Sequence, residues 1–181
     1  MGKKPMSKVW RPSHSDVMIR LLEREQAENS YVRDYLEGLE FNFGDVTARA
    51  DLVLIESGRS VRAGRGKTLV LYEIRTESRE LMPVLYESCR QIELYRLGLR
   101  YPRTFVSDPE KAEKIGGSLS FKVYIVLDDD VWFERILFHR RYLDKMDKLL
   151  KHFEAGIITY NKNWKFKNDS RYFGFDISTS G

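Results

Sequence analysis

Apolar side chains recur at helical spacing in some stretches of this chain and form short continuous runs in others. From Pro12 to Leu39 they recur at steps of three and four residues, which predicts a first helix with Ser13 or Ser15 as its N-cap. The same spacing over residues 79–98 predicts a second helix that ends at Gly98. Two shorter helices are expected at residues 108–114 and 140–153.

Short apolar runs bounded by polar loops predict the strands. Residues 49–55 (Arg-Ala-Asp-Leu-Val-Leu-Ile) and 69–75 (Leu-Val-Leu-Tyr-Glu-Ile-Arg) each have the character of a strand, and the Gly- and Arg-rich segment between them predicts a hairpin with a long basic tip. Residues 121–127 predict a buried strand, closed by three aspartates. A short strand is expected at 41–43 and a terminal hairpin from 163–167 and 171–175.

The predicted order of elements is helix, three strands, helix, strand and helix. A strand, a crossover helix and a parallel strand form a βαβ-like unit beside a three-strand meander. The expected fold class is α/β, a mixed β-sheet flanked by helices, with a C-terminal helix and a small hairpin. We divide the chain into an N-terminal tail (1–12), one domain (13–156) and an aromatic, basic appendage packed on that domain (157–181).

Length and composition restrict the classes of protein to consider. A chain of 181 residues with 42% hydrophobic residues can build a single domain with a real core. Its net charge of +4 is compatible with a polyanionic partner. Cys89 is the only cysteine, which excludes an intrachain disulfide and, in a monomer, a cysteine-ligated iron–sulfur or zinc site. No apolar run suits a signal peptide or a membrane span, so we expect a cytoplasmic protein.

Two neighbouring predicted strands each carry one acid inside an apolar run, Asp51 and Glu73. Burying a carboxylate is costly, and two of them side by side repel each other when both are ionised. A divalent metal ion would relieve that repulsion and is itself a catalyst of phosphodiester hydrolysis. An alternative without a metal is that Asp51 caps a strand while Glu73 pairs with Arg75 or Arg49.

The order and spacing of these residues resemble the PD-(D/E)xK nuclease superfamily, which has a restriction-endonuclease-like core. Asp51 on one strand is followed 22 residues later by Glu73-Ile74-Arg75 on the next. The helix after it carries Gln91-Ile92-Glu93-Leu94-Tyr95, which is similar to the Q-x-x-x-Y motif of the RecB-type and CRISPR-adaptation nucleases. The resemblance covers residues 13–127 and implies a nuclease that hydrolyses DNA phosphodiester bonds.

The resemblance also implies a cofactor and its ligands. Mg²⁺ or Mn²⁺ would be held by Asp51, the Glu73 side chain and the Ile74 carbonyl. Glu28 on the first helix is a further ligand candidate because its position predicts that it faces the core. His14, ahead of the aspartate, is another, although a histidine at a helix start is commonly a cap or a solvated side chain.

Position 75 departs from the family pattern, which has lysine there. Arg75 keeps the positive charge and can bind a phosphate with two hydrogen bonds, but its pKa above roughly 12 prevents it from acting as a general base. Lys67 or Lys122 would be a substitute lysine. The alternative function is therefore a catalytically weakened or inactive nuclease fold that binds nucleic acid or a partner protein.

The remaining predictions concern catalysis and partners. Gln91 and Tyr95, one helical turn apart, are expected to point together towards the metal site. The partner would be DNA, or alternatively RNA, with no membrane, and a homodimer stays open. The aromatic residues near the C-terminus have two candidate roles, packing of a hairpin or stacking on unpaired bases. The residues expected to contact phosphates are Arg49, Arg62, Arg65, Lys67, Arg79 and Arg90.

Overall fold

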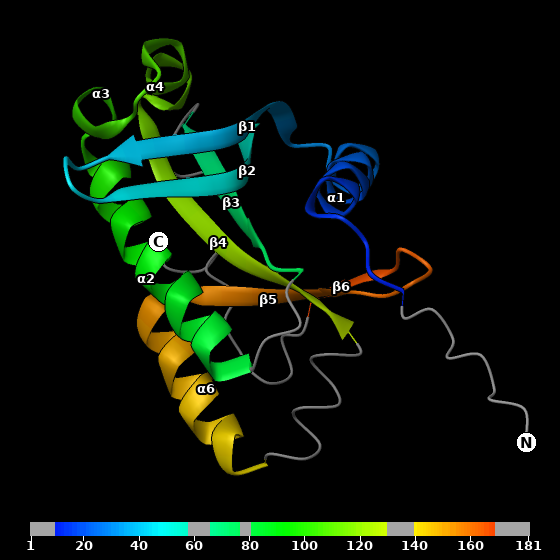
Figure 1. Cartoon of the computed structure of the whole chain (residues 1–181). Coiled ribbons are helices and arrows are strands. Elements are labelled where there is room, and N and C mark those ends of the chain that lie inside the picture. The colour runs from blue at the N-terminus through cyan, green and yellow to red at the C-terminus, as the bar shows by residue number, and fades with distance from the viewer. Residues whose placement is uncertain (1–9, 58–65, 77–80, 130–139, 169–181) are drawn as a thin grey trace, which may run out of the picture.

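A six-stranded mixed sheet, with its strands in chain order, runs through the protein (Figure 1). The computed structural model describes residues 10–57, 66–76, 81–129 and 140–168. The strands are β1 (Val32–Asn42), β2 (Thr47–Ser57), β3 (Lys67–Ile74), β4 (Ser118–Asp128), β5 (Ala155–Tyr160) and β6 (Phe166–Asn168). The helices are α1 (His14–Glu28), α2 (Leu81–Arg100), α3 (Pro102–Phe105), α4 (Pro109–Ile115) and α6 (Arg140–Phe153).

The strand directions place three carboxyl ends at one edge of the sheet. Strands β1, β2 and β3 form an antiparallel meander. Strand β3 is parallel to β4, and β4 is parallel to β5, whereas β6 returns antiparallel to β5. The chain crosses from β3 to β4 through α2, α3 and α4, and from β4 to β5 through α6. The carboxyl ends of β3, β4 and β5 therefore lie at the same end of the sheet.

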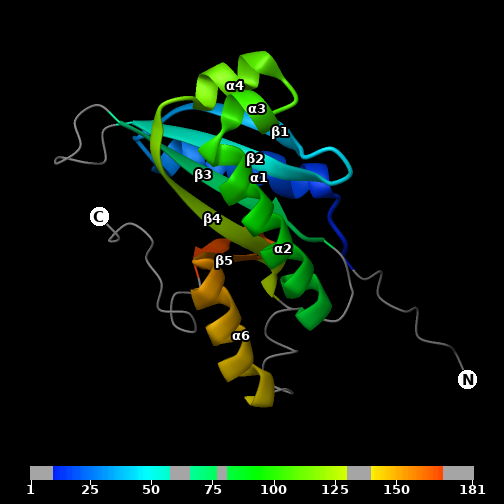
Figure 2. The same cartoon turned by 90° about the vertical axis from the view of Figure 1, so that its left-hand side faces the viewer.

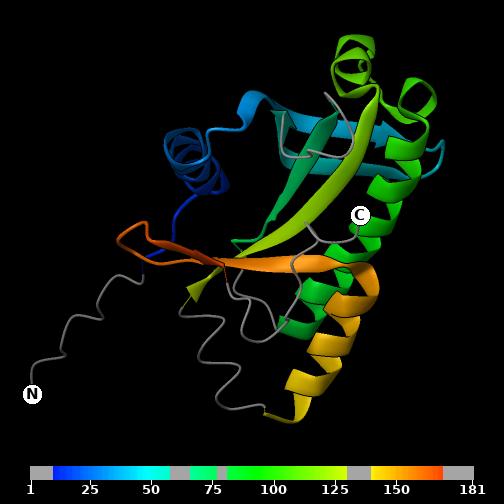
Figure 3. The same ribbon diagram turned by 180° about the vertical axis from the view of Figure 1, so that it is seen from behind.

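Helices cover both faces of this sheet. Helix α1 lies on one face, and α2 and α6 lie together on the other (Figures 2 and 3). On the first face Val17 and Leu21 of α1 pack against apolar side chains of β2 to β5. On the second face Leu85 and Ile92 of α2 and Leu150 of α6 pack against the opposite sides of the strands. Within the described ranges, no helix is long and apolar enough to cross a membrane.

The expected first helix over residues 12–39 is wrong in its second half. Helix α1 ends at Glu28, and the residues from Val32 onwards form β1. The apolar spacing misled because β1 does not alternate strictly between its two faces. Gly38 adopts a φ of +62°, and the register with β2 shifts near Val32. These irregularities space the apolar residues of the strand in a way that imitates a helix.

Other elements agree with the sequence more closely. Helix α6 has the predicted bounds, and the predicted hairpin of β2 and β3 is confirmed. The tip of that hairpin, residues 58–65, lies outside the described residues. Strand β5, which is buried throughout, was not predicted. The segment expected to open a terminal hairpin instead pairs with β5 as β6, and residues 171–175 lie outside the described part of the chain.

Gly98 allows α2 to approach β1 closely. It is a buried helical residue, and a Cβ added to it would overlap the ring of Phe41, which is fully buried. Glycine normally weakens a helix by roughly 0.5–1 kcal/mol relative to alanine. The close approach of the Phe41 ring therefore explains why position 98 is a glycine.

Replacing Gly98 by alanine should lower the free energy of unfolding by about 1–2 kcal/mol, because the cost of overpacking exceeds the gain in helix propensity. Urea unfolding followed by circular dichroism measures this difference. Glu93→Ala, at an exposed position of the same helix, should stay within about 0.5 kcal/mol of the wild type. A Gly98→Ala protein as stable as the wild type would contradict the close approach.

Candidate functional site

Asp51 lies where β2 and β3 separate. The pairing of these strands ends at Leu52 opposite Tyr72, one residue before Asp51 is reached. The Asp51 side chain then spans the gap, since its Oδ2 accepts a hydrogen bond of 2.7 Å from the Ile74 backbone N–H. On the other side of β2, Asp51 falls opposite Gly38, the residue with positive φ. The acid is thus fixed at an irregular point of the sheet.

His14 contacts the other oxygen of the same carboxylate. Its Nε2 lies 3.1 Å from Asp51 Oδ1. His14 is the first residue of α1, and a capping box between Ser13 and Asp16 fixes the start of that helix. The hydrogen bond to Asp51 is the main cause that raises the pKa of His14 above 6.5. A protonated His14 therefore balances the charge of Asp51.

Glu73 is the most deeply buried acid of this site, with a side chain only 7% exposed. Burial is the main cause that raises its pKa from 4.5 to about 7. The guanidinium of Arg75 opposes this rise, and the nearby charge of Asp51 adds to it. Arg75 Nη2 lies 2.7 Å from Glu73 Oε1. Glu73 therefore changes its protonation state near neutral pH.

The Tyr95 hydroxyl connects α2 to both acid-bearing strands. It lies within hydrogen-bonding distance of Glu73 Oε2 and 2.8 Å from the Arg49 carbonyl oxygen. A hydroxyl carries one proton and can donate it to only one of these acceptors at a time. When Glu73 is protonated, its carboxyl can donate to Tyr95 while Tyr95 donates to the carbonyl. The ring of Tyr95 packs on Phe41, which holds the hydroxyl in place.

The guanidinium of Arg75 contacts residues of both β3 and α2. Besides Glu73 it contacts Ser88, where Arg75 Nε donates a hydrogen bond of 3.1 Å to the hydroxyl oxygen. Its Nη1 lies 3.9 Å from Glu87. Sequence reasoning gave Ser88 and Glu87 no role. The signal was present, because Ser88 and Tyr95 lie seven residues apart on one face of the helix.

The donor atoms needed for a metal ion are present, but not all of them are available. His14 and Asp51 offer an imidazole nitrogen and a carboxylate oxygen in contact with each other, and the carboxylate is a donor that suits Mn²⁺. Both Glu73 oxygens already have partners, Arg75 and Tyr95. Across the described ranges, no three His, Cys, Asp or Glu side chains together could hold a metal ion as they stand. Glu73 would have to exchange a partner for the metal.

One predicted metal ligand, Glu28, lies elsewhere. Glu28, expected to face the core, has a side chain 67% exposed and pairs with Arg24 on the surface of α1. The inward acid of that helix is Glu25, three residues earlier, whose side chain is 14% exposed and lines a polar cavity against the sheet. Gln91 is half-buried, and no hydrogen bond of its side chain is recorded within the described part of the chain.

The predicted basic contacts are scattered. Arg49 and Arg90 are exposed, whereas Lys67 donates its ammonium to the carbonyl of Lys114, 3.1 Å away, at the far end of β3. Lys122 lines a polar cavity of about 100 Å³ with Glu25, on the α1 face. Neither lysine can substitute at the acids, because one lies at the wrong end of the strand and the other on the wrong face. Outside the described residues lie Arg62, Arg65 and Arg79.

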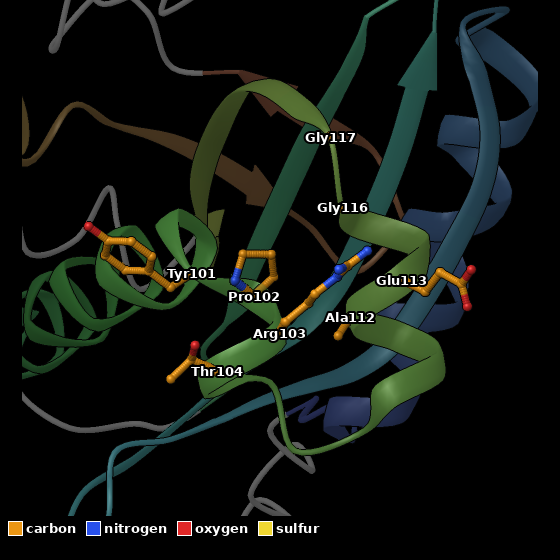
Figure 4. A pocket seen from close by; sticks show the side chains of 8 residues that line it. All are labelled: Tyr101, Pro102, Arg103, Thr104, Ala112, Glu113, Gly116 and Gly117. Carbon is orange, nitrogen blue, oxygen red and sulfur yellow. The ribbon is translucent and has the colours of Figure 1, made fainter.

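A larger hollow lies at the opposite end of the sheet. It has a volume of about 470 Å³ and is formed between α3 and α4, with Tyr101, Arg103 and Gly117 among its lining residues (Figure 4). Gly117 directly precedes the amino end of β4, whereas the acids lie near the carboxyl end of β3. This hollow is therefore separate from the acidic site.

Comparison with known proteins gives no match, whether against protein-family models, curated proteins or solved structures. The assignment of a function therefore depends on the geometry described above.

The raised pKa of Glu73 predicts that stability changes with pH. Between about pH 4.5 and about pH 7 the folded protein holds a proton on Glu73 that the unfolded chain has released. The free energy of unfolding should therefore fall as the pH rises through this window, by at most roughly 3 kcal/mol from this group. Chemical unfolding at a series of pH values measures the slope.

Glu73→Gln should flatten that slope, because the substituted side chain does not titrate. Glu37→Gln, at an exposed position of β1, is the matched control and should retain the wild-type slope. Equal slopes in the wild type and Glu73→Gln would show that Glu73 does not titrate in this window.

Proposed function

We propose that the protein is a metal-dependent nuclease that hydrolyses DNA phosphodiester bonds at the site of His14, Asp51 and Glu73. The observation that carries this proposal is that two carboxylates lie close enough to interact electrostatically where the pairing of β2 with β3 ends. Asp51 accepts a hydrogen bond from Ile74, the residue next to Glu73, and its charge helps to raise the pKa of Glu73. A buried acid such as Glu73, whose pKa is raised by its surroundings and by a neighbouring carboxylate, is typical of a functional site.

The fold supports the same proposal. A helix, an antiparallel meander of three strands, a crossover helix and a parallel strand follow one another in the chain. This is the order that the resemblance to the PD-(D/E)xK nucleases implies. We therefore infer a restriction-endonuclease-like core, with Asp51 on the second strand and Glu73 on the third.

Each residue has a distinct part in this proposal. Asp51, Glu73 and His14 would hold Mg²⁺ or Mn²⁺, which when bound lowers the pKa of water and offsets charge on the phosphate. Tyr95 positions the Glu73 carboxyl from α2. Arg75 has the fork of donors that suits a phosphate, but it cannot accept a proton from water near neutral pH.

Asp51→Asn and Glu73→Gln should each reduce metal-dependent DNA cutting by more than about 100-fold. Loss of a residue that only orients a metal ligand costs about 10–100-fold in activity, and loss of the ligand itself should cost more. Plasmid cutting in Mg²⁺ or Mn²⁺ measures the activity, and calorimetric titration with Mn²⁺ measures binding of the metal. Both substitutions keep the side-chain shape, so the fold should survive.

Glu25→Gln is the matched control, since it removes a largely buried carboxyl from the opposite face of the sheet. It should cut at the wild-type rate. Cutting by the double variant Asp51→Asn/Glu73→Gln at the wild-type rate would rule out this site.

A second candidate function, a nuclease fold that binds nucleic acid without cutting it, is favoured by one specific observation. Arg75 holds Glu73 in a close ion pair and is itself held by Ser88 and Glu87. This arrangement keeps a cation where the metal would need the carboxylate. It also agrees with the alternative without a metal ion, in which Glu73 pairs with Arg75.

Arg75→Lys separates the two candidates. A lysine cannot contact Glu73, Ser88 and Glu87 with a fixed fork, so Glu73 is released more readily to a metal. If the protein is a nuclease, we expect Arg75→Lys to raise Mn²⁺ affinity and cutting by about tenfold. Arg24→Lys, which alters another ion-paired arginine, should change neither. DNA binding without cutting in any metal, in both the wild type and Arg75→Lys, would establish the second function.

A further inference from the structure

Four aromatic side chains form a contiguous strip beside the start of α1, which we call the aromatic strip: Trp10, Tyr160, Trp164 and Phe166. The ring centroid of Trp10 lies 5.4 Å from that of Trp164 and 6.2 Å from that of Tyr160. Tyr160 stacks on Trp164 at 6.2 Å and lies equally far from Phe166. Tyr160 is buried, whereas Trp10 is 38% exposed. The strip has a buried base and an indole ring open to solvent.

Positive charge surrounds the aromatic strip. The guanidinium of Arg20 lies 5.8 Å from the centre of the Trp164 ring, and that of Arg24 lies 5.8 Å from the centre of the Phe166 ring. Both arginines also pair with glutamates of α1. Four further cations are exposed and have no ion pair recorded among the described residues: Arg11, Lys162, Lys165 and Lys167. These four cations flank the rings along the chain, and Asp128, paired with Tyr160 across the sheet, is the acid beside them.

The turn between β5 and β6 holds its aromatic residue in an unusual conformation. Trp164 has a φ of +57°, in the left-handed region that a bulky side chain occupies at a cost of roughly 1–3 kcal/mol. Asn161 fixes the turn, since its carbonyl accepts from the Trp164 N–H and its side chain accepts from the Asn163 and Lys165 N–H groups. Exposed lysines near β6 could be explained by the need to protect an edge strand from pairing with other chains. That need does not explain why Trp164 is held in a strained conformation.

The aromatic strip adjoins the acidic site. Trp10 lies four residues before His14, and the segment that leads into α1 passes beside the β5–β6 turn (Figures 1 and 3). Across the sheet, Ile74 pairs with Val126, and two residues further Asp128 pairs with Tyr160. Two strand spacings and two residues put about 12 Å between the backbones of Ile74 and Tyr160, whose side chains lie on the α1 face of the sheet, whereas Glu73 lies on the α2 face with Tyr95. This distance is short compared with a bound strand of roughly 4–16 nucleotides.

We propose that the aromatic strip and its lysines bind single-stranded nucleic acid and guide it to the acidic site, an inference that rests on the proposed function. Bases stack on exposed aromatic rings, and phosphates pair with the surrounding cations. A duplex keeps the faces of its bases stacked inside, so its phosphates would contact the lysines but its bases would not stack on the indole rings. The surface therefore prefers an unpaired strand.

Binding in EDTA tests this inference without cutting. Fluorescence anisotropy of labelled oligo(dT), and of a duplex of the same length, gives the two affinities for the full chain. Oligo(dT) should bind at least fivefold more tightly and should quench the tryptophan fluorescence. Trp10→Ala should weaken oligo(dT) binding by roughly tenfold and leave duplex binding unchanged. Tyr86→Ala, which removes a 67% exposed ring from α2, is the matched control and should have no effect.

The lysines are tested by the dependence of binding on salt. Lys162→Ser/Lys165→Ser/Lys167→Ser should reduce the slope of log K against log salt by about 2, close to 0.7 for each phosphate contact. Lys148→Ser, at an exposed position of α6, should keep nearly the whole slope. Polyglutamate carries charge without bases and should compete only weakly.

Four outcomes would overturn the inference: no binding, equal affinity for oligo(dT) and duplex, unchanged binding by Trp10→Ala, or competition by polyglutamate as strong as by oligo(dT). The last would assign the surface to an acidic protein. Preferential binding of oligo(dT) by a protein that never cuts would support the aromatic strip and reject the nuclease proposal. If the protein cuts DNA but its binding does not respond to these substitutions, the nuclease proposal is supported and the role of the aromatic strip is rejected.

Discussion

The burial of the Glu73 carboxyl is the constraint around which the surrounding elements are arranged. A carboxylate with so little exposure is costly to ionise unless partners replace the lost water. Arg75 supplies a charge and Tyr95 a hydroxyl, and both depend on where α2 lies across the strands. The Asp51 carboxylate on the neighbouring strand also has partners that replace water, the Ile74 backbone N–H and the His14 side chain. Two strands and two helices are therefore tied together by two acids.

This arrangement also makes metal binding an exchange of charges. When His14 is protonated and Glu73 is ionised, His14 and Arg75 each neutralise one carboxylate. A metal would have to displace a proton or a guanidinium to enter. Arginine is harder to displace than lysine, because its fork contacts Glu73, Ser88 and Glu87 together. Position 75 thus separates the two proposed functions, cutting of nucleic acid and binding without cutting.

The sequence predicted the parts of this site that depend on local pattern. Apolar runs gave the β2–β3 hairpin and therefore the neighbouring acids. They misplaced β1, because the left-handed Gly38 interrupts the alternation of that strand. Glu28 and Glu25 lie three residues apart on one helix, and only the rotation of α1 on the sheet decides which one faces inward. The contact of Arg75 with Ser88 was equally hidden, since it depends on how α2 crosses β3.

Topology explains why the acidic site and the aromatic strip lie together. In parallel sheets, loops that follow the carboxyl ends of the strands meet at one edge, and ligands commonly bind there. The acids lie near this end of β3, and Tyr160 closes β5 at the same edge. Because β6 turns back antiparallel, Trp164 is brought beside the segment that opens α1. That segment carries both Trp10 and His14, so one short stretch of chain joins the surface proposed to stack bases to a side chain that contacts Asp51.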